Sequence, residues 1–152
     1  LINQAPMRDA VTRFIAHRLA AQRVSLVGTP KRLATNTDLR GLLTHHPVIL
    51  PTLDSSVRTG FDALTDKLGV RPQVAAEIDD MAMLRLLARE DMGLAVLPPI
   101  VVRDELADGS LAEADQLPGI EESFYAITTR RQFPNPLLRA LLDQDFGPQV
   151  AN

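Results

Sequence analysis

A regular alternation of short apolar runs and longer helical patterns fills the middle of the chain and limits its fold most. The apolar runs are VIL at 48–50, QVAAEI at 73–78 and LAVL at 94–97, followed by helical patterns over 55–69, 80–91 and 99–109. Strands that alternate with helices through short loops form parallel sheets covered by helices. VIL and LAVL are continuously apolar, as is typical of strands buried on both faces. The alternation therefore predicts an α/β fold.

The expected helix boundaries carry residues that usually begin and end helices. Apolar residues recur at the helical period in the helix expected at 55–69, at Val57, Phe61, Leu64 and Leu68. Gly69, Gly93 and Gly109 stand where these helices end. Each helix can also begin after a side chain that accepts a hydrogen bond from its first N–H groups. The candidates for three successive helices are Thr37 or Asp38, Asp54 or Ser55, and Asp79 or Asp80.

The two flanks of the chain have a different rhythm. Val24–Val27 predicts a strand that Gly28–Thr29–Pro30 ends, and Leu1 and Ile2 resemble the end of a buried strand, which indicates a fragment of a longer protein. After the third helix, LAEAD at 111–115 and SFYAITT at 123–129 are expected to be extended, and 134–146 to be a last helix. The possible joints between domains are 28–30 and the loop LPGIEES at 117–123.

Composition excludes several classes of function. The 152 residues carry a net charge of −3 without a run of lysine or arginine, so the chain is not expected to bind DNA alone. Cysteine is absent, which excludes disulfides and thiolate zinc sites. No apolar run reaches the roughly 20 residues that span a membrane. The chain is 45% hydrophobic and 23% charged, the balance of a globular protein.

No pattern of catalytic or metal-binding residues stands out. Ser55 and Ser56 follow a strand, but LDSSVRTG lacks the glycines of a nucleophile elbow. His45 and His46 are adjacent and do not share a helix face, and no metal-binding spacing or phosphate loop occurs. We therefore expect no catalytic residue, no metal and no cofactor. The helix at 80–91 has an apolar arc wider than one sheet face requires. That arc indicates either a subunit contact or a helix buried between neighbours.

Four motifs in the middle of the chain carry a family resemblance: LGVRP at 68–72, EID at 77–79, GLAVLP at 93–98 and LADGSL at 106–111. Together they resemble the second half of the effector-binding region of LysR-type transcriptional regulators. The sequence SFYAITTRRQFPNPLLRALLD at 123–143 is similar to the strand and helix that close that region. LINQAPMRDA at 1–10 and VSLVGTP at 24–30 look like the branch that includes the regulator of a sodium/proton antiporter.

The resemblance implies a bilobed α/β fold like that of a periplasmic binding protein. Residues 29–120 would form the whole second lobe, while 1–28 and 121–152 would be parts of the first. It also implies a cytoplasmic sensing domain that is not an enzyme. A small molecule or ion would bind between the lobes, and copies would join through the helix at 80–91. DNA would be bound only by an N-terminal domain absent from this chain.

Six residues at the ends of the expected strands are the predicted effector contacts: Asp54, Ser55, Ser56, Asp79, Leu97 and Pro98. The carboxyl ends of parallel strands lie at one edge of a sheet, where α/β proteins bind ligands. Helix N-termini there favour anions, but Asp54 and Asp79 oppose a negative charge. We therefore predict a neutral, polyhydroxylated or cationic effector. Each aspartate also has a simpler explanation as a helix cap.

Two other functions remain open from the sequence. A fragment of a solute-binding transport protein would have a similar fold, and a secretion signal upstream would identify it. An α/β enzyme would need a nucleophile or a paired acid and base, and no such pair stands out in the sequence.

Overall fold

The computed structural model describes residues 14–34 and 38–129. The chain divides into two compact units, one formed by Arg23–Glu121 and the other by Leu1–Gln22 together with Glu122–Asn152. Strands β1 (Phe14–Gly28) and β5 (Ala112–Thr129) each have residues in both units. The helix expected at 134–146 and the strand end expected at residues 1 and 2 lie outside the described residues. The assignment of the units to the two lobes stays a prediction.

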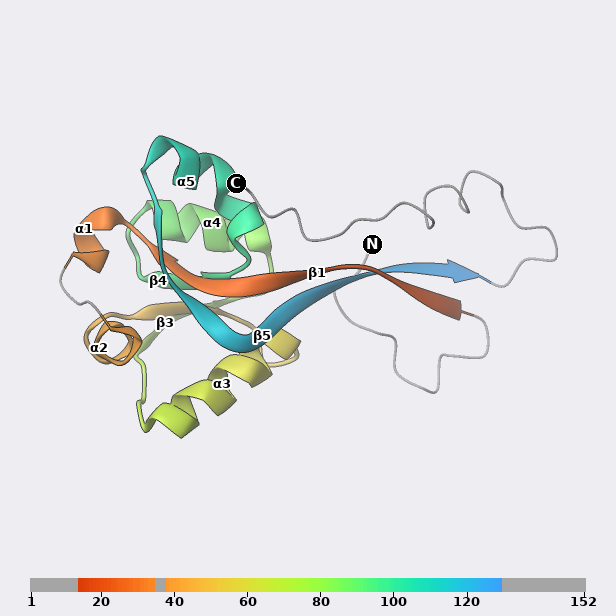
Figure 1. The fold of residues 1–152 in the computed structure, drawn as a ribbon, viewed down its shortest axis with the longest axis horizontal. Helices are drawn as coiled ribbons and strands as arrows, with labels where there is room; N and C mark the ends of the chain where they lie inside the picture. Colours follow the sequence, from red (N-terminus) through yellow and green to blue (C-terminus); the bar gives the residue numbers. More distant parts are fainter. Residues whose placement is uncertain (1–13, 35–37, 130–152) are drawn as a thin grey trace. The chain divides into compact units, whose positions relative to one another are not determined.

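The strands form one mixed sheet in the order β3-β2-β4-β1-β5 (Figure 1). β2 (Val48–Pro51) is central to the parallel part, because it pairs in parallel with both β3 (Val74–Ile78) and β4 (Leu94–Leu97). β1 pairs with β4 in the antiparallel direction, with Leu26 opposite Val96. The predicted α/β fold is confirmed.

Helices connect the strands where the alternation predicts them. α1 (Pro30–Leu33) and α2 (Leu39–His45) precede β2, α3 (Ser56–Leu68) joins β2 to β3, and α4 (Met81–Arg89) joins β3 to β4. The single helix predicted at 99–109 is instead a 3-10 helix, η2 (Pro99–Val102), followed by the α-helix α5 (Arg103–Asp108). The Val101 N–H donates to the Pro98 carbonyl three residues earlier at 3.0 Å, which is the hydrogen bond of a 3-10 turn. No helix among the described residues is long and apolar enough to cross a membrane.

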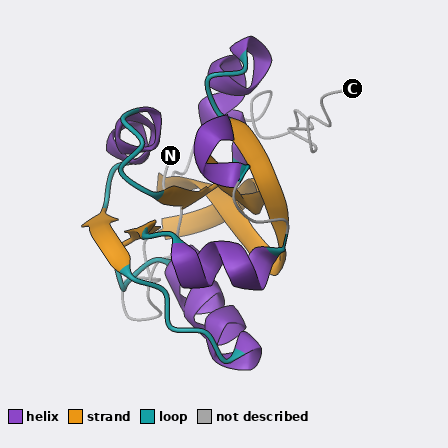
Figure 2. Cartoon of the chain, turned by 90° about the vertical axis from the view of Figure 1, so that its left-hand side faces the viewer, coloured by secondary structure: helices purple, strands orange, loops and turns teal. Residues whose placement is uncertain are grey.

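Alternating side chains of the strands divide the unit Arg23–Glu121 into two cores. Leu26, Leu50 and Val96 face the core that α2 and α3 cover, whereas Val27, Ile49 and Leu97 face the core that α4 and α5 cover. Successive strand residues point to opposite faces, so β1, β2 and β4 each contribute to both cores. Figure 2 shows the resulting arrangement, with helices on either side of the strands. This double burial explains why VIL and LAVL are continuously apolar.

The end of the chain beyond α5 differs from the prediction. Two extended segments separated by a loop at 117–123 were expected, but β5 is one strand of 18 residues. Leu117 and Ile120 are buried in the core beside α3, which holds the expected loop against the sheet. Gly119 adopts a φ of 75°, a conformation that glycine accommodates without strain, so the strand continues past Pro118.

Candidate functional site

The carboxyl ends of β2, β3 and β4 lie at one edge of the sheet in the unit Arg23–Glu121. The parallel pairing sets this arrangement, with Pro51 of β2 opposite Ile78 of β3. We call residues 51–56, 78–80 and 97–100 the strand-end edge. All six predicted effector contacts belong to these three segments. The structure therefore brings them to one edge of the sheet, as the expected parallel strands require.

The six predicted residues differ in how their side chains are presented. Asp54, Ser56 and Asp79 are exposed, so they are accessible to a ligand. Ser55 is buried, and its Oγ accepts a hydrogen bond from the Val57 N–H at 3.2 Å. Leu97 and Pro98 are also buried. Leu97 belongs to the core beneath α4, so only its backbone is positioned to contribute at the edge.

The structure decides which of the alternative residues cap the helices. Ser55 caps α3 and Asp38 caps α2, where Asp38 Oδ1 accepts from the Gly41 N–H at 3.0 Å. Asp80 caps α4, because its Oδ1 accepts from the Ala82 N–H at 2.6 Å and the Met83 N–H at 3.2 Å. Asp54 and Asp79 are therefore not the N-cap residues of the helices that follow them. The simpler explanation of these two aspartates as helix caps is wrong.

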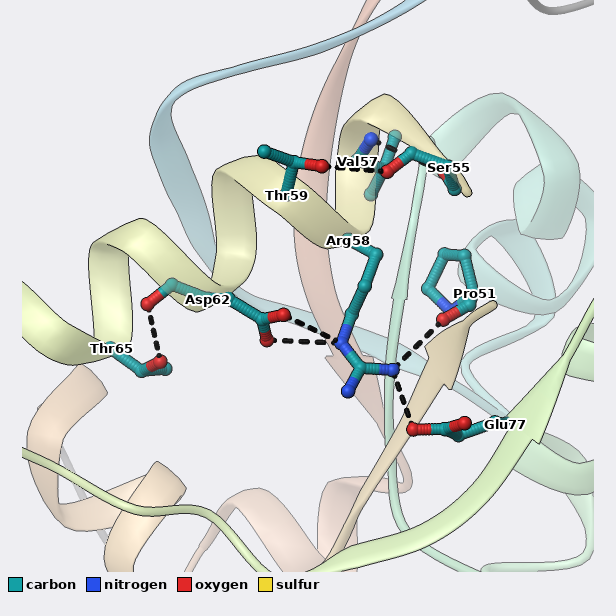
Figure 3. Close-up of polar contacts among 8 residues, drawn as sticks. All are labelled: Pro51, Ser55, Val57, Arg58, Thr59, Asp62, Thr65 and Glu77. Carbon is teal, nitrogen blue, oxygen red and sulfur yellow. Dashed lines mark hydrogen bonds and ion pairs between the residues drawn. The ribbon is translucent and has the colours of Figure 1, made fainter. Parts of the chain in front are cut away.

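Arg58 on α3 is a buried residue of this region that the sequence motifs did not indicate (Figure 3). Its Nε donates to both carboxylate oxygens of Asp62 at 3.0 Å, and its Nη1 donates to Glu77 Oε1 at 2.7 Å and to the Pro51 carbonyl at 3.3 Å. Burial lowers the pKa of Arg58, but the hydrogen bonds to Glu77 and Asp62 outweigh it and raise the pKa above its ordinary value. In the sequence, the spacing of Arg58 and Asp62, four residues apart on one helix, could have indicated the ion pair between them.

Charge at the strand-end edge is predominantly negative. Asp54, Asp79 and Asp80 belong to it, and Glu77 and Asp62 lie beside it around the single buried Arg58. Among the residues that the structure describes, no group of three histidine, aspartate or glutamate side chains is placed to hold a metal ion. His45 and His46 precede β2, so they lie toward the opposite edge of the sheet. The arrangement offers hydrogen-bonding groups and an acidic field to a bound molecule.

α4 presents apolar side chains to solvent on the side away from its core. Leu84 and Ala88 are buried against the sheet, while Met83 and Leu86 are each 45% exposed. Arg85 connects α4 to α5, because its Nε donates to Glu105 Oε1 at 2.7 Å. The broad apolar arc thus has one buried side and one exposed side, and the exposed side is available for a contact.

Comparison with protein families gives a match over almost the whole chain. Residues 4–144 match the model of the LysR substrate binding domain. No match was found among curated proteins.

Three solved structures with the same fold are an effector-binding domain and two regulatory domains. The effector-binding domain of QuiR in complex with shikimate aligns with a TM-score of 0.65 and 17% identity, over 92% of this chain and 66% of QuiR. The apo regulatory domain of HypT from Salmonella typhimurium aligns with a TM-score of 0.66 and 22% identity, over 91% of this chain and 65% of HypT. The regulatory domain of CcmR from Synechocystis PCC6803 in complex with 2-PG aligns with a TM-score of 0.67 and 15% identity, over 93% and 68%.

These identities are low, so the structural likeness shows the fold alone. This chain spans about two thirds of the length of the QuiR and HypT chains.

Proposed function

This chain belongs to the LysR substrate-binding domain family, and from that premise we propose that it is the effector-sensing part of a LysR-type transcriptional regulator. A small ligand would shift the domain between two conformations and so act on a DNA-binding domain outside this chain. The observation that carries the proposal is the strand-end edge, where three parallel strands end together beside exposed polar side chains. The family match favours a regulator over a transport protein.

We propose that the effector contacts Asp54, Ser55 and Ser56 after β2, Asp79 after β3, and Leu97 and Pro98 at the end of β4. Asp54, Ser56 and Asp79 would contribute exposed side chains. Ser55 would contribute the O–H of its hydroxyl, because Oγ accepts from the Val57 N–H and keeps its own proton to donate. Leu97 and Pro98 would contribute backbone atoms and shape. The two aspartates disfavour a simple carboxylate and favour a neutral, polyhydroxylated or cationic molecule.

The remaining properties of the proposed regulator follow from the family. It would be cytoplasmic and would have no catalytic activity of its own. The narrower resemblance to the sodium/proton antiporter regulator favours a sodium-linked signal. We also propose the division into lobes that the resemblance implies, with residues 29–120 as the second lobe and residues 1–28 and 121–152 as parts of the first.

We further propose that copies of the chain associate through α4. Met83 and Leu86 supply an exposed apolar surface there, and the helix is anchored from behind by Leu84 and Ala88. A second copy that covered these two side chains would remove apolar area from water, which favours association.

Calorimetric titration tests the charge preference of the site. The probes are succinate, myo-inositol and sodium chloride, added to the parent protein and to the variants Asp54→Asn and Asp79→Asn. We expect inositol or sodium to bind the parent more tightly than succinate, and each variant to gain affinity for succinate. Asp66→Asn, on an exposed residue near the other end of α3, is the control and should change nothing. Tight succinate binding to the parent that neither variant strengthens would contradict the proposal.

A further inference from the structure

We infer that Arg58 is a positioning residue of the strand-end edge. It holds the turn between β2 and α3, together with the end of β3, in the arrangement that a ligand would meet. The inference rests on the proposed function for its meaning in ligand binding. Its structural part stands on the contacts of Arg58 alone. Arg58 itself is 90% buried at the side chain, so it acts on a ligand through the residues that it holds.

Hydrogen bonds of both the backbone and side chains close the turn between β2 and α3. The Ser55 N–H donates to the Thr52 carbonyl at 3.0 Å, and the Val57 N–H donates to Ser55 Oγ at 3.2 Å. Another is the bond from Arg58 Nη1 to the Pro51 carbonyl at 3.3 Å, which attaches the first turn of α3 to the last residue of β2. Arg58 therefore spans the segment that carries Asp54, Ser55 and Ser56.

Arg58 also binds the neighbouring strand β3. The same Nη1 donates to Glu77 Oε1 at 2.7 Å, and Glu77 lies on β3 two residues before Asp79. β3 is the outermost strand of the sheet, so among the described strands it pairs with β2 alone. The guanidinium thus joins α3, β2 and β3 at the point where both strands end (Figure 3). A lysine has one ammonium group and lacks the planar fork that reaches three partners at once.

Arg58 also offsets part of the negative charge beside the strand-end edge. Arg58 pairs with the carboxylates of Asp62 and Glu77, which are 49% and 43% exposed at the side chain. Pairing directs both carboxylates toward the guanidinium, and it partly neutralises them. Without Arg58 these two charges would add to the field of Asp54 and Asp79. The buried arginine therefore limits how acidic the strand-end edge is toward a ligand.

Hydrogen exchange of the full chain without any added ligand tests the positioning role. In Arg58→Met we expect the Ser55 and Val57 amides to exchange about tenfold faster relative to the Ala95 amide in the core, because hydrogen bonds to a charged group are lost. Arg58→Lys should give an intermediate ratio. Arg71→Met removes an exposed arginine beyond α3 and is the matched control, with unchanged exchange.

A second variant keeps the test decisive if Arg58→Met does not fold. Glu77→Gln removes one charged partner of Arg58 from an exposed position, and it should also raise the Ser55 and Val57 exchange ratios, by a smaller factor. Unchanged ratios in every variant that folds would overturn the inference. Because these measurements contain no ligand, they are independent of the calorimetric test. If no probe binds but the ratios change, the positioning role stands and the ligand proposal fails.

Discussion

Helices α3 and α4 begin alike but differ in how much of their surface is buried. Each follows a parallel strand, and each starts at a side chain that caps its first turn, Ser55 in α3 and Asp80 in α4. α3 buries Phe61 almost completely, together with the charged Arg58. α4 leaves Leu86 nearly half exposed. One helix is built into the core, and the other is covered on one side.

The difference arises from what lies against the outer side of each helix. On α3, Gly60 approaches β5 so closely that an added Cβ would lie 3.2 Å from Ile120 Cγ1. β5, the last strand in the order of the sheet, thus packs closely against α3. On α4, nothing among the described residues covers Met83 and Leu86 to the same degree. The proposed roles of the two helices rest on this difference, with α3 proposed as part of the framework of the effector site and α4 as a surface for association.

The largest expected effect is a difference in stability between two variants, each with one apolar side chain truncated on one of the two helices. Phe61→Ala on α3 should lower the free energy of unfolding by about 3–5 kcal/mol, because it leaves a cavity in a packed core. Leu86→Ala on α4 should lower it by less than about 1 kcal/mol in the dissociated chain, because the side chain is half exposed. Urea denaturation at low protein concentration measures both. Equal losses would remove the basis of the comparison.

A charged surface on α4 should break association without unfolding the chain. The double variant Met83→Glu, Leu86→Glu should raise the dissociation constant of the oligomer at least about a hundredfold, because buried unpaired charges cost several kcal/mol. Light scattering over a concentration series gives the mass. Met92→Glu, on an exposed apolar residue outside α4, is the control. An unchanged mass in a folded double variant would show that α4 is not the contact.

The two caps should contribute similar, smaller amounts. Ser55→Ala removes one acceptor from α3, and Asp80→Ala removes an acceptor of two N–H groups from α4. Each should cost about 1 kcal/mol of stability. Ser56→Ala, at an exposed position that does not cap, should stay within about 0.5 kcal/mol of the parent. Chemical denaturation distinguishes them, and a loss confined to the control would refute the assignment of the caps.

The smallest expected effect is a pH dependence that belongs to α4 and α5. Burial raises the pKa of Glu105, but the hydrogen bond from Arg85, a backbone hydrogen bond and the charges of Arg85 and Arg89 together outweigh burial and hold the pKa below its ordinary value. A carboxyl whose folded pKa is lowered contributes stability above its unfolded pKa of about 4.3, and loses it as the pH falls through the folded pKa. Glu105→Gln should therefore differ from the parent most near neutral pH.

The difference between parent and Glu105→Gln should shrink below about pH 4, where the parent carboxyl becomes protonated as well. Thermal unfolding across this pH range measures it. Asp104→Asn, on the exposed neighbouring residue, should give no comparable change. A constant difference down to low pH would show that the Arg85–Glu105 pair does not set the acid dependence.

Much of the fold could be predicted because it depends on local patterns. Continuous apolar runs predicted β2 and β4, and the capping residues predicted the starts of α2, α3 and α4 to within one residue, since both signals come from neighbouring residues. The long β5 could not be predicted, because Pro118–Gly119 is typical of a turn. What holds it in the sheet is the burial of Leu117 and Ile120 against α3. That contact joins residues far apart in the sequence.

Part of the candidate site could likewise be predicted from the sequence, and part could not. The strand ends that carry Asp54, Asp79 and Pro98 followed from parallel topology alone. Arg58 did not, because its importance depends on Glu77 of another strand and on a backbone carbonyl of β2. Burial of a charged side chain is set by its tertiary partners, and a single sequence shows at most the partner four residues away.

The most direct test of the account maps a bound ligand onto the backbone. The amide chemical shifts of the labelled chain are followed while the tightest-binding of the calorimetric probes is added. The account predicts the largest shift changes at Ser55, Ser56, Asp79 and Ile100, all at the strand-end edge. Largest changes at His46 and Asp91, which precede β2 and β4 at the other edge of the sheet, would contradict it.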